Sequence, residues 1–225
     1  MKRINNIFYS LQGEGRNTGR AAVFVRFAGC NLRCPFCDTE FDSYREMSDE
    51  EILTAVEALT SEYGLQTSDY RPLVVLTGGE PTLQVDEAFV DLLHRHGYEV
   101  AMESNGTRLA PKNLDWLTVS PKVIRGEGQE VRGERLPDEL KIIFDENTAP
   151  ETYLSPLTSY LSPPSLCSPI APSSRLPLKP YLYLQPCDTG DAERNARILK
   201  RCVEYIKEHP QWRLSLQTHK LIGIE

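Results

Sequence analysis

The chain has 225 residues, of which 40% are hydrophobic and 25% are charged, and this composition is typical of a folded globular protein rather than a disordered one. The length predicts a single domain spanning 1–225. The formal net charge of −7 argues against a nucleic-acid-binding surface. No apolar run approaches the ~20 residues that cross a membrane. We therefore expect a cytoplasmic protein without a signal peptide.

Short apolar runs alternate with helical patterns along the chain, which predicts βαβ units and a mainly parallel sheet of the α/β class. In chain order, we expect a strand at 23–27 and a helix that begins with the capping-box pattern of Ser48 and Glu51. A strand at 73–76, a helix around 89–93 and strands at 98–102, 116–119, 140–144 and 181–184 follow. A long helix at 191–209 and a strand at 212–216 complete the prediction.

Residues 146–180 differ from the rest in composition. Eight of the 16 prolines lie between 150 and 180, with serines among them. Proline lacks a backbone N–H, so this stretch cannot be a central strand or an uninterrupted helix. We expect a long excursion from the fold, which is either a lid or a poorly ordered insertion.

Polar or glycine-rich segments follow five of the predicted strands. They begin at Cys30, Gly78-Gly79, Ser104-Asn105, Ser120-Pro121-Lys122 and Gln185-Pro186. The carboxyl ends of parallel strands meet at one edge of a sheet, where ligands bind in α/β proteins. The sequence therefore predicts one binding site built from these five segments.

Cys30, Cys34 and Cys37 form a CxxxCxxC pattern in the loop after the strand at 23–27. Three thiolates on a short loop can hold a [4Fe–4S] cluster and leave one iron open to a small molecule. A structural zinc site needs four ligands, and no nearby His or Cys supplies the fourth, although a distant one could. A zinc-binding or electron-carrying module, and three cysteines without a metal, stay open as alternatives.

With Gly78-Gly79-Glu80-Pro81 after the strand at 73–76, the cysteine loop resembles the radical S-adenosylmethionine superfamily. The resemblance implies a shortened, modified, partial (β/α) barrel in which the open iron binds S-adenosylmethionine. An electron from the cluster then cleaves this cofactor to a 5′-deoxyadenosyl radical, which abstracts a hydrogen from the substrate. An activase that installs a glycyl radical on a partner protein is the alternative within the superfamily.

Further segments are similar to the 7-carboxy-7-deazaguanine synthase family: Leu11-Gln12-Gly13-Glu14-Gly15, Glu103-Ser104-Asn105-Gly106-Thr107, Asp138-Glu139-Leu140-Lys141 and Leu216-Gln217-Thr218-His219-Lys220. This resemblance implies the radical ring contraction of 6-carboxy-5,6,7,8-tetrahydropterin to 7-carboxy-7-deazaguanine, with loss of ammonia, on the route to queuosine and other 7-deazapurines. It also implies Mg²⁺, a homodimer and an electron donor such as flavodoxin or ferredoxin. From the net charge and the lack of a long apolar run, we expect no nucleic-acid or membrane partner.

The resemblance assigns roles to the residues at matching positions. Cys30, Cys34 and Cys37 would ligate the cluster, and Thr39 would bind Mg²⁺ through its hydroxyl. The predicted contacts of S-adenosylmethionine are Phe36, Cys37, Asp38, Gly79, Ser120, Pro121, Lys122, Tyr183, Leu184, Gln185 and Pro186. The predicted contacts of the substrate are Leu11, Gln12, Gly13, Glu14, Arg26, Thr77, His219 and Glu225.

Four of these residues also have simpler explanations. Phe36 could only pack within its loop, Thr39 could make a local hydroxyl–backbone bond, and Arg26 could face outward from an edge strand. His219 could be an ordinary surface or core histidine. Among the remaining cysteines, the helical spacing of Cys202 predicts a core position, whereas Cys167 and Cys187 receive no role.

Overall fold

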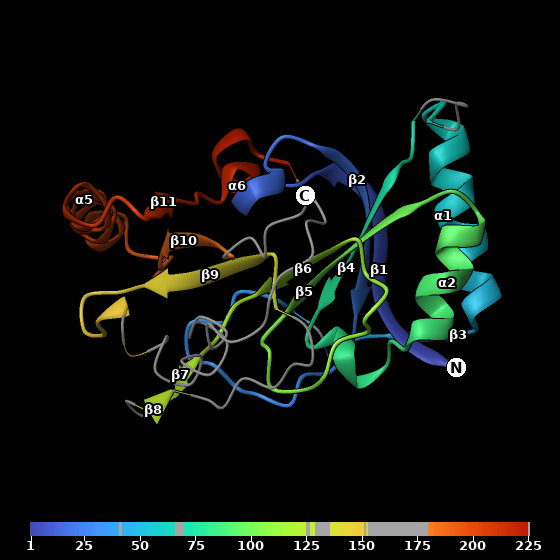
Figure 1. Ribbon diagram of the computed structural model, residues 1–225, viewed down its shortest axis with the longest axis horizontal. Helices are drawn as coiled ribbons and strands as arrows, with labels where there is room; N and C mark the ends of the chain where they lie inside the picture. The colour runs from blue at the N-terminus through green and yellow to red at the C-terminus, as the bar shows by residue number, and fades with distance from the viewer. Residues whose placement is uncertain are drawn as a thin grey trace, which may run out of the picture.

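The computed structural model describes residues 1–40, 42–65, 70–124, 127–128, 136–150, 152 and 180–224. Its main sheet contains β1 (Lys2–Leu11), β2 (Ala21–Phe27), β3 (Arg45–Met47), β4 (Leu73–Gly78), β5 (Glu99–Ser104), β6 (Trp116–Val119), β9 (Glu139–Phe144), β10 (Tyr181–Pro186) and β11 (Trp212–Leu214). The spatial order of these nine strands is β11-β10-β9-β6-β5-β4-β2-β1-β3 (Figure 1). A separate antiparallel pair consists of β7 (Val123–Ile124) and β8 (Glu127–Gly128).

Every neighbouring pair from β2 to β11 is parallel, which confirms the mainly parallel α/β sheet. The sheet is not closed, because β11 and β3 stay at opposite edges, so the expected partial barrel is also confirmed. All the predicted strands are present. The sequence did not predict β1 and β3, which extend the sheet in antiparallel fashion. In β1 the register shifts between Ile4 and Asn6, and this irregularity obscures the alternation that marks a strand.

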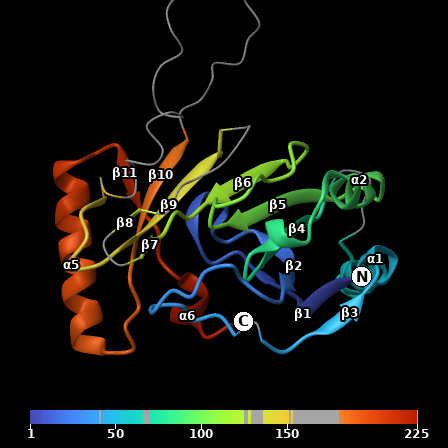
Figure 2. The same cartoon turned by 90° about the horizontal axis from the view of Figure 1, so that it is seen from below.

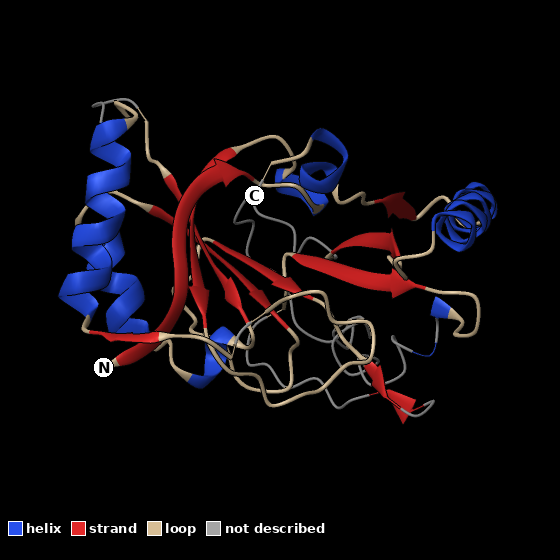
Figure 3. Cartoon of the chain, turned by 180° about the vertical axis from the view of Figure 1, so that it is seen from behind, coloured by secondary structure: helices blue, strands red, loops and turns tan. Residues whose placement is uncertain are grey.

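The described helices are α1 (Asp49–Glu62), α2 (Glu87–Arg95), α5 (Ala192–Glu208) and the short α6 (Thr218–Ile222), with 3₁₀ turns η1 (Gly15–Asn17) and η2 (Pro81–Leu83). The three predicted helices are confirmed, and α1 has the expected capping box between Ser48 and Glu51. Figures 2 and 3 show α1 and α2 grouped beside one part of the sheet, while α5 lies beside β10 and β11 at the other end. None of the described helices is long and apolar enough to cross a membrane.

The two faces of the sheet have different roles, because neighbouring side chains on a strand point to opposite faces. Val25 and Leu76 are fully buried in the hydrophobic core that also contains residues of α1 and α2. Their neighbours Arg26 and Thr77 line a pocket instead. Since β2 lies between β1 and β4, the alternative of an outward-facing Arg26 on an edge strand is wrong.

A second core cluster lies under α5 and includes Leu184, Ile198 and Cys202. Cys202 is fully buried there, which confirms its predicted core position. Most of the predicted excursion at 146–180 lies outside the described residues, as do Cys167 and Glu225.

Candidate active site

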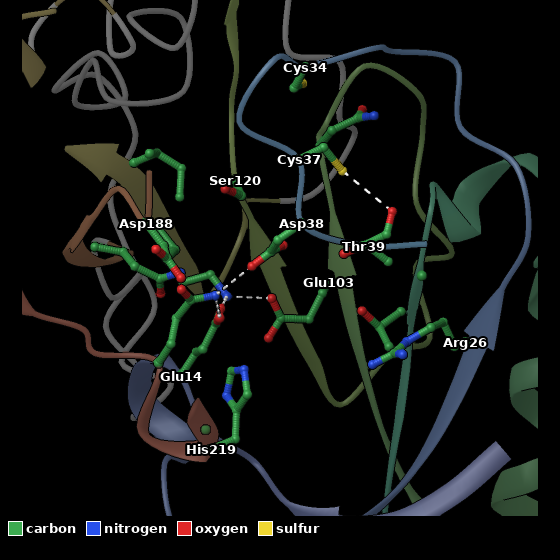
Figure 4. A pocket seen from close by; sticks show the side chains of 18 of the residues that line it. Glu14, Arg26, Cys34, Cys37, Asp38, Thr39, Glu103, Ser120, Asp188 and His219 are labelled. Atoms are coloured by element: carbon green, nitrogen blue, oxygen red, sulfur yellow. Dashed lines mark hydrogen bonds and ion pairs between the residues drawn. The ribbon is translucent and has the colours of Figure 1, made fainter. Parts of the chain in front are cut away.

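A pocket of about 500 Å³ lies on the face of the sheet that carries Arg26 and Thr77, and its volume falls within the range of small-molecule sites. The five segments that the sequence placed at strand ends all contribute to its wall, so their expected convergence is confirmed. The view in Figure 4 shows the thiols of Cys34 and Cys37 at one end of the pocket and Glu14 and His219 at the other. The pocket therefore has two chemically distinct ends.

Most of the predicted site residues line this pocket: Leu11, Gln12, Gly13, Glu14, Arg26, Cys30, Cys34, Phe36, Cys37, Asp38, Thr39, Thr77, Gly79, Ser120, Lys122, Gln185, Pro186 and His219. Pro121, Tyr183 and Leu184 are buried and do not line it. The side chain of Leu184 packs in the core under α5, and its carbonyl oxygen accepts a hydrogen bond from the Ser215 N–H at 2.9 Å.

The cysteine loop places Cys30, Cys34 and Cys37 on one wall as free thiols. The Cys37 N–H donates to the carbonyl oxygen of Cys34 at 3.1 Å, which closes the loop into a turn. The Leu32 N–H donates to the Cys30 sulfur at 3.4 Å, and N–H donors of this kind favour a thiolate. Among the described residues, no three His, Cys, Asp or Glu side chains form a site for a single metal ion.

The electrostatics of these thiols fit a bound cluster. Burial raises the pKa of both Cys30 and Cys34, and the neighbouring thiols raise each pKa further. The ammonium of Lys122 acts in the opposite direction and lowers the pKa of Cys34. Cationic iron would remove the mutual repulsion, because a metal binds the thiolate form and displaces the proton. Phe36 also lines this wall, with the Lys122 Nζ 5.9 Å from its ring centre.

The loop after β4 supports the cysteine loop from behind. A Cβ on Gly79 would lie 2.1 Å from the carbonyl oxygen of Gly29, so only glycine permits this close approach. The Glu80 carboxylate is fully buried and accepts hydrogen bonds from the Ser104 hydroxyl at 2.8 Å and the Asn105 N–H at 2.7 Å. The side chain of Asn105 in turn lies 3.9 Å from the Cys30 sulfur. The Gly-Gly-Glu segment therefore fixes the cysteine loop to the ends of β4 and β5.

At the other end, Lys141 joins two acidic residues. Its Nζ lies 2.5 Å from Glu14 Oε2 and 2.6 Å from Glu103 Oε2. Burial alone would raise the pKa of Glu14, but the charge and hydrogen bond of Lys141 lower it below its ordinary value. Neither Glu103 nor Lys141 was among the predicted site residues. The sequence signal that could have identified them is a charged residue in each of two apolar strands, β5 and β9. Charged side chains are rare at such positions unless they have a partner.

The segment after β11 forms another part of the wall. Lys220 Nζ lies 2.6 Å from Asp38 Oδ2 and 2.8 Å from Asp188 Oδ2, and thereby connects α6 with the cysteine loop and with the loop after β10. Burial would raise the pKa of Asp38, but the hydrogen bonds from Lys220 and Gln217 lower it. His219 lies directly against Gly13, where an added Cβ would be 2.1 Å from its Nδ1. The sequence predicted His219 in this wall, but not Lys220, Asp188 or Gln217.

Arg26 and Thr39 also line the pocket. The Arg26 guanidinium lies 5.0 Å from the ring centre of Phe8, which leaves its N–H groups available to an anion. Thr39 lies in the pocket wall, and its carbonyl oxygen is 3.9 Å from the Cys37 sulfur. The next residue, Glu40, fixes this loop to β1, because its carboxylate accepts a hydrogen bond from the Asn5 side chain at 2.9 Å.

Comparison with known proteins gives three findings. The family model for the radical SAM superfamily matches residues 24–125. Curated relatives named 7-carboxy-7-deazaguanine synthase are 40% identical, one from Bacteroides thetaiotaomicron over 100% of this chain and 99% of the relative, and one from Nitratidesulfovibrio vulgaris over 99% and 98%. The crystal structure of QueE from Escherichia coli is similar at a TM-score of 0.67 and 27% identity, covering 96% of this chain and 93% of that chain.

Proposed function

We propose that the end of the pocket with the cysteines holds the cofactors and that the end with Glu14 holds the pterin substrate, because the chain belongs to the 7-carboxy-7-deazaguanine synthase family of the radical S-adenosylmethionine superfamily. The reaction is the radical ring contraction of 6-carboxy-5,6,7,8-tetrahydropterin to 7-carboxy-7-deazaguanine, with loss of ammonia. Family membership sets aside the activase and the zinc-binding module that the sequence left open. The observation that carries the assignment of the two ends is that the three thiols and the Glu14–Lys141–Glu103 group line one pocket.

A [4Fe–4S] cluster and S-adenosylmethionine are the cofactors, and when bound they supply the radical that takes a hydrogen atom from the substrate. Cys30, Cys34 and Cys37 would hold three irons of the cluster, and their placement on one wall supports this role. Gly79 allows a ligand to approach the backbone closely. Phe36 offers an aromatic face for adenine, and the polar groups of Ser120, Lys122 and Gln185 would bind the other parts of the cofactor.

The substrate end offers the polar groups that a pterin requires. The pyrimidine edge of a pterin carries N–H and NH₂ donors, which match the carboxylate acceptors of Glu14 and Glu103. The substrate carboxylate matches the guanidinium of Arg26, which has Thr77 as its partner on β4. His219, which packs on Gly13, lies at the same end of the pocket as Glu14 (Figure 4). These residues would position the ring so that one hydrogen faces the cofactors.

Thr39 is the proposed protein ligand of Mg²⁺. The ion prefers hard oxygen donors and keeps several waters, so one hydroxyl with the substrate carboxylate is sufficient. Thr39→Ala is expected to reduce the stimulation of turnover by Mg²⁺ at least tenfold, whereas Thr39→Ser, which keeps the hydroxyl, should preserve it. Iron content serves as the control, since neither change removes a thiol. An unchanged Mg²⁺ titration in Thr39→Ala would exclude this residue.

The remaining proposals concern the setting of the enzyme. We infer a homodimer and reduction by a flavodoxin or ferredoxin from the resemblance, and a single domain from the length of the chain. A cytoplasmic location accords with five free cysteines among the described residues, because reducing compartments keep thiols reduced. Sedimentation analysis and activity assays with each purified electron donor test these points.

The decisive experiment is an anaerobic assay of the reconstituted protein with S-adenosylmethionine, Mg²⁺, a reductant and the carboxytetrahydropterin. We expect 7-carboxy-7-deazaguanine from the wild type, and neither a stable cluster nor product from Cys34→Ala. Cys187→Ala is the matched control, because Cys187 lines the same pocket outside the three-cysteine motif and should leave the cluster in place. A colourless protein with one bound zinc, or full activity of Cys34→Ala, would refute the proposed function.

A further inference from the structure

Lys141 occupies an unusual position for a lysine. It lies on β9 with its side chain on the pocket face, between Leu140 and Ile142, which belong to the core clusters on the other face. Only 3% of its surface is exposed. Lysine is almost never buried to this extent unless its ammonium group is paired, so its contacts must account for its position.

Those contacts connect four segments of the chain. Besides Lys141 Nζ, Glu14 accepts a hydrogen bond from the Gln217 side chain at 3.1 Å through its other oxygen, Oε1. Glu103 accepts one from the Gln12 side chain at 2.9 Å, also through Oε1. Each carboxylate is therefore held at both oxygens, and each oxygen keeps a second lone pair for a ligand. Within the described part of the chain, Lys141 is the one group that both carboxylates share.

The charges of this group depend on the lysine. Burial would lower the pKa of Lys141, yet the charges and hydrogen bonds of Glu103 and Glu14 raise it above its ordinary value. Glu139, two residues earlier on β9, adds a third acidic side chain, and Glu103 is among the causes that raise its pKa. Glu14 and Glu103 are half-buried. Without the ammonium group, these carboxylates would repel one another, and one of them would take up a proton and become a donor.

We propose that Lys141 is a positioning residue that keeps Glu14 and Glu103 ionised and oriented, so that the pocket presents a pair of charged acceptors to the donor edge of a neutral heterocycle. This proposal rests on the proposed function, because it explains how the same site selects a pterin. A heterocycle with an acceptor at that edge, in place of an N–H or NH₂ group, would face two carboxylates and be rejected.

A double-mutant cycle between Lys141→Met and Glu103→Gln tests this role. Lys141→Met is expected to weaken binding of 6-carboxy-5,6,7,8-tetrahydropterin on the order of 100-fold, with iron content and S-adenosylmethionine binding retained. Glu103→Gln alone also weakens pterin binding. Adding Glu103→Gln to Lys141→Met should instead improve binding about tenfold and raise Tm, because it removes one of the two carboxylates that lost their shared counterion and so ends their mutual repulsion.

Lys220→Met is the matched control, because Lys220 is also held between two carboxylates but in another part of the pocket. The effects of Lys220→Met and Glu103→Gln on pterin binding and Tm should therefore add, and Glu103→Gln should not improve either quantity in the Lys220→Met variant. The role of Lys141 would be overturned if Glu103→Gln weakened pterin binding equally in the wild type and in Lys141→Met. It would also be overturned if the double variant had no higher Tm than Lys141→Met. The Tm comparison needs no substrate, so its failure concerns Lys141 alone, whereas a wild type that neither binds nor converts the pterin contradicts the proposed function.

Discussion

Glu139 gives a quantitative test of how burial controls charge beside the site. It is the first residue of β9, is only 2% exposed, and accepts a hydrogen bond from the Arg16 N–H at 2.8 Å. Burial and, secondarily, the charge of Glu103 raise its pKa from 4.5 to about 7, although Lys141 acts in the opposite direction. Glu139→Gln removes the titration but leaves an amide oxygen that can accept the same hydrogen bond.

The magnitude follows from linkage between protonation and folding. The difference of roughly 2.5 pH units corresponds to between about 3 and 4 kcal/mol at about 1.4 kcal/mol per unit. The unfolded chain releases this proton near pH 4.5, whereas the folded protein keeps it until about pH 7. The Glu139 carboxyl therefore stabilises the fold fully below pH 4.5, and this stabilisation is lost as the pH rises to 7.

The assay is anaerobic denaturant unfolding of the wild type and Glu139→Gln at several values between pH 5 and 8. As the pH rises across this range, we expect the free energy of unfolding of the wild type to fall relative to that of Glu139→Gln by most of this amount. Glu204→Gln, at an exposed position on α5, controls for the loss of one carboxylate. A difference that stays constant with pH, or that shifts in favour of the wild type, would refute the reasoning.

Three further predictions concern the supports of the site. Glu80→Ala leaves buried donors without their acceptor and should lower the free energy of unfolding by about 3 kcal/mol in a denaturant titration. Gly79→Ala would force a Cβ to within 2.1 Å of the Gly29 carbonyl oxygen, so the anaerobically reconstituted variant should lose most of its iron; retention of iron would contradict this contact. Lys220→Met removes the ion pair of Asp38 and should weaken S-adenosylmethionine binding about tenfold in an equilibrium titration, with Lys220→Arg restoring most of it.

Much of the fold could be predicted from the sequence because the parallel strands are compact apolar runs. The segment at 23–27 was identifiable as a strand from its β-branched and aromatic residues, and β2 covers it. By contrast, β1 contains Asn5 and Asn6 at its register shift, and β3 has only three residues, so neither shows a clear alternation of apolar and polar residues. Antiparallel pairing at the edge was therefore not visible in the local pattern.

The candidate site was predicted unevenly, for a physical reason. The cysteine loop is local in sequence, so the spacing of Cys30, Cys34 and Cys37 indicates its chemistry directly. The pair of Glu14 and Lys141 is separated by 127 residues, and only the three-dimensional structure brings these two side chains together. Within an apolar strand, the sequence alone did not indicate which face Lys141 occupies.

The close packing of His219 on Gly13 has a practical consequence for handling the protein. The N-terminal Met1 is 78% exposed and lies far from α6 (Figure 1), whereas the last described residues follow directly on the helix that carries His219 and Lys220. An affinity tag or fluorescent fusion is therefore best attached before Met1. The same addition at the other terminus would follow directly on the helix that carries His219, and could disturb its packing on Gly13.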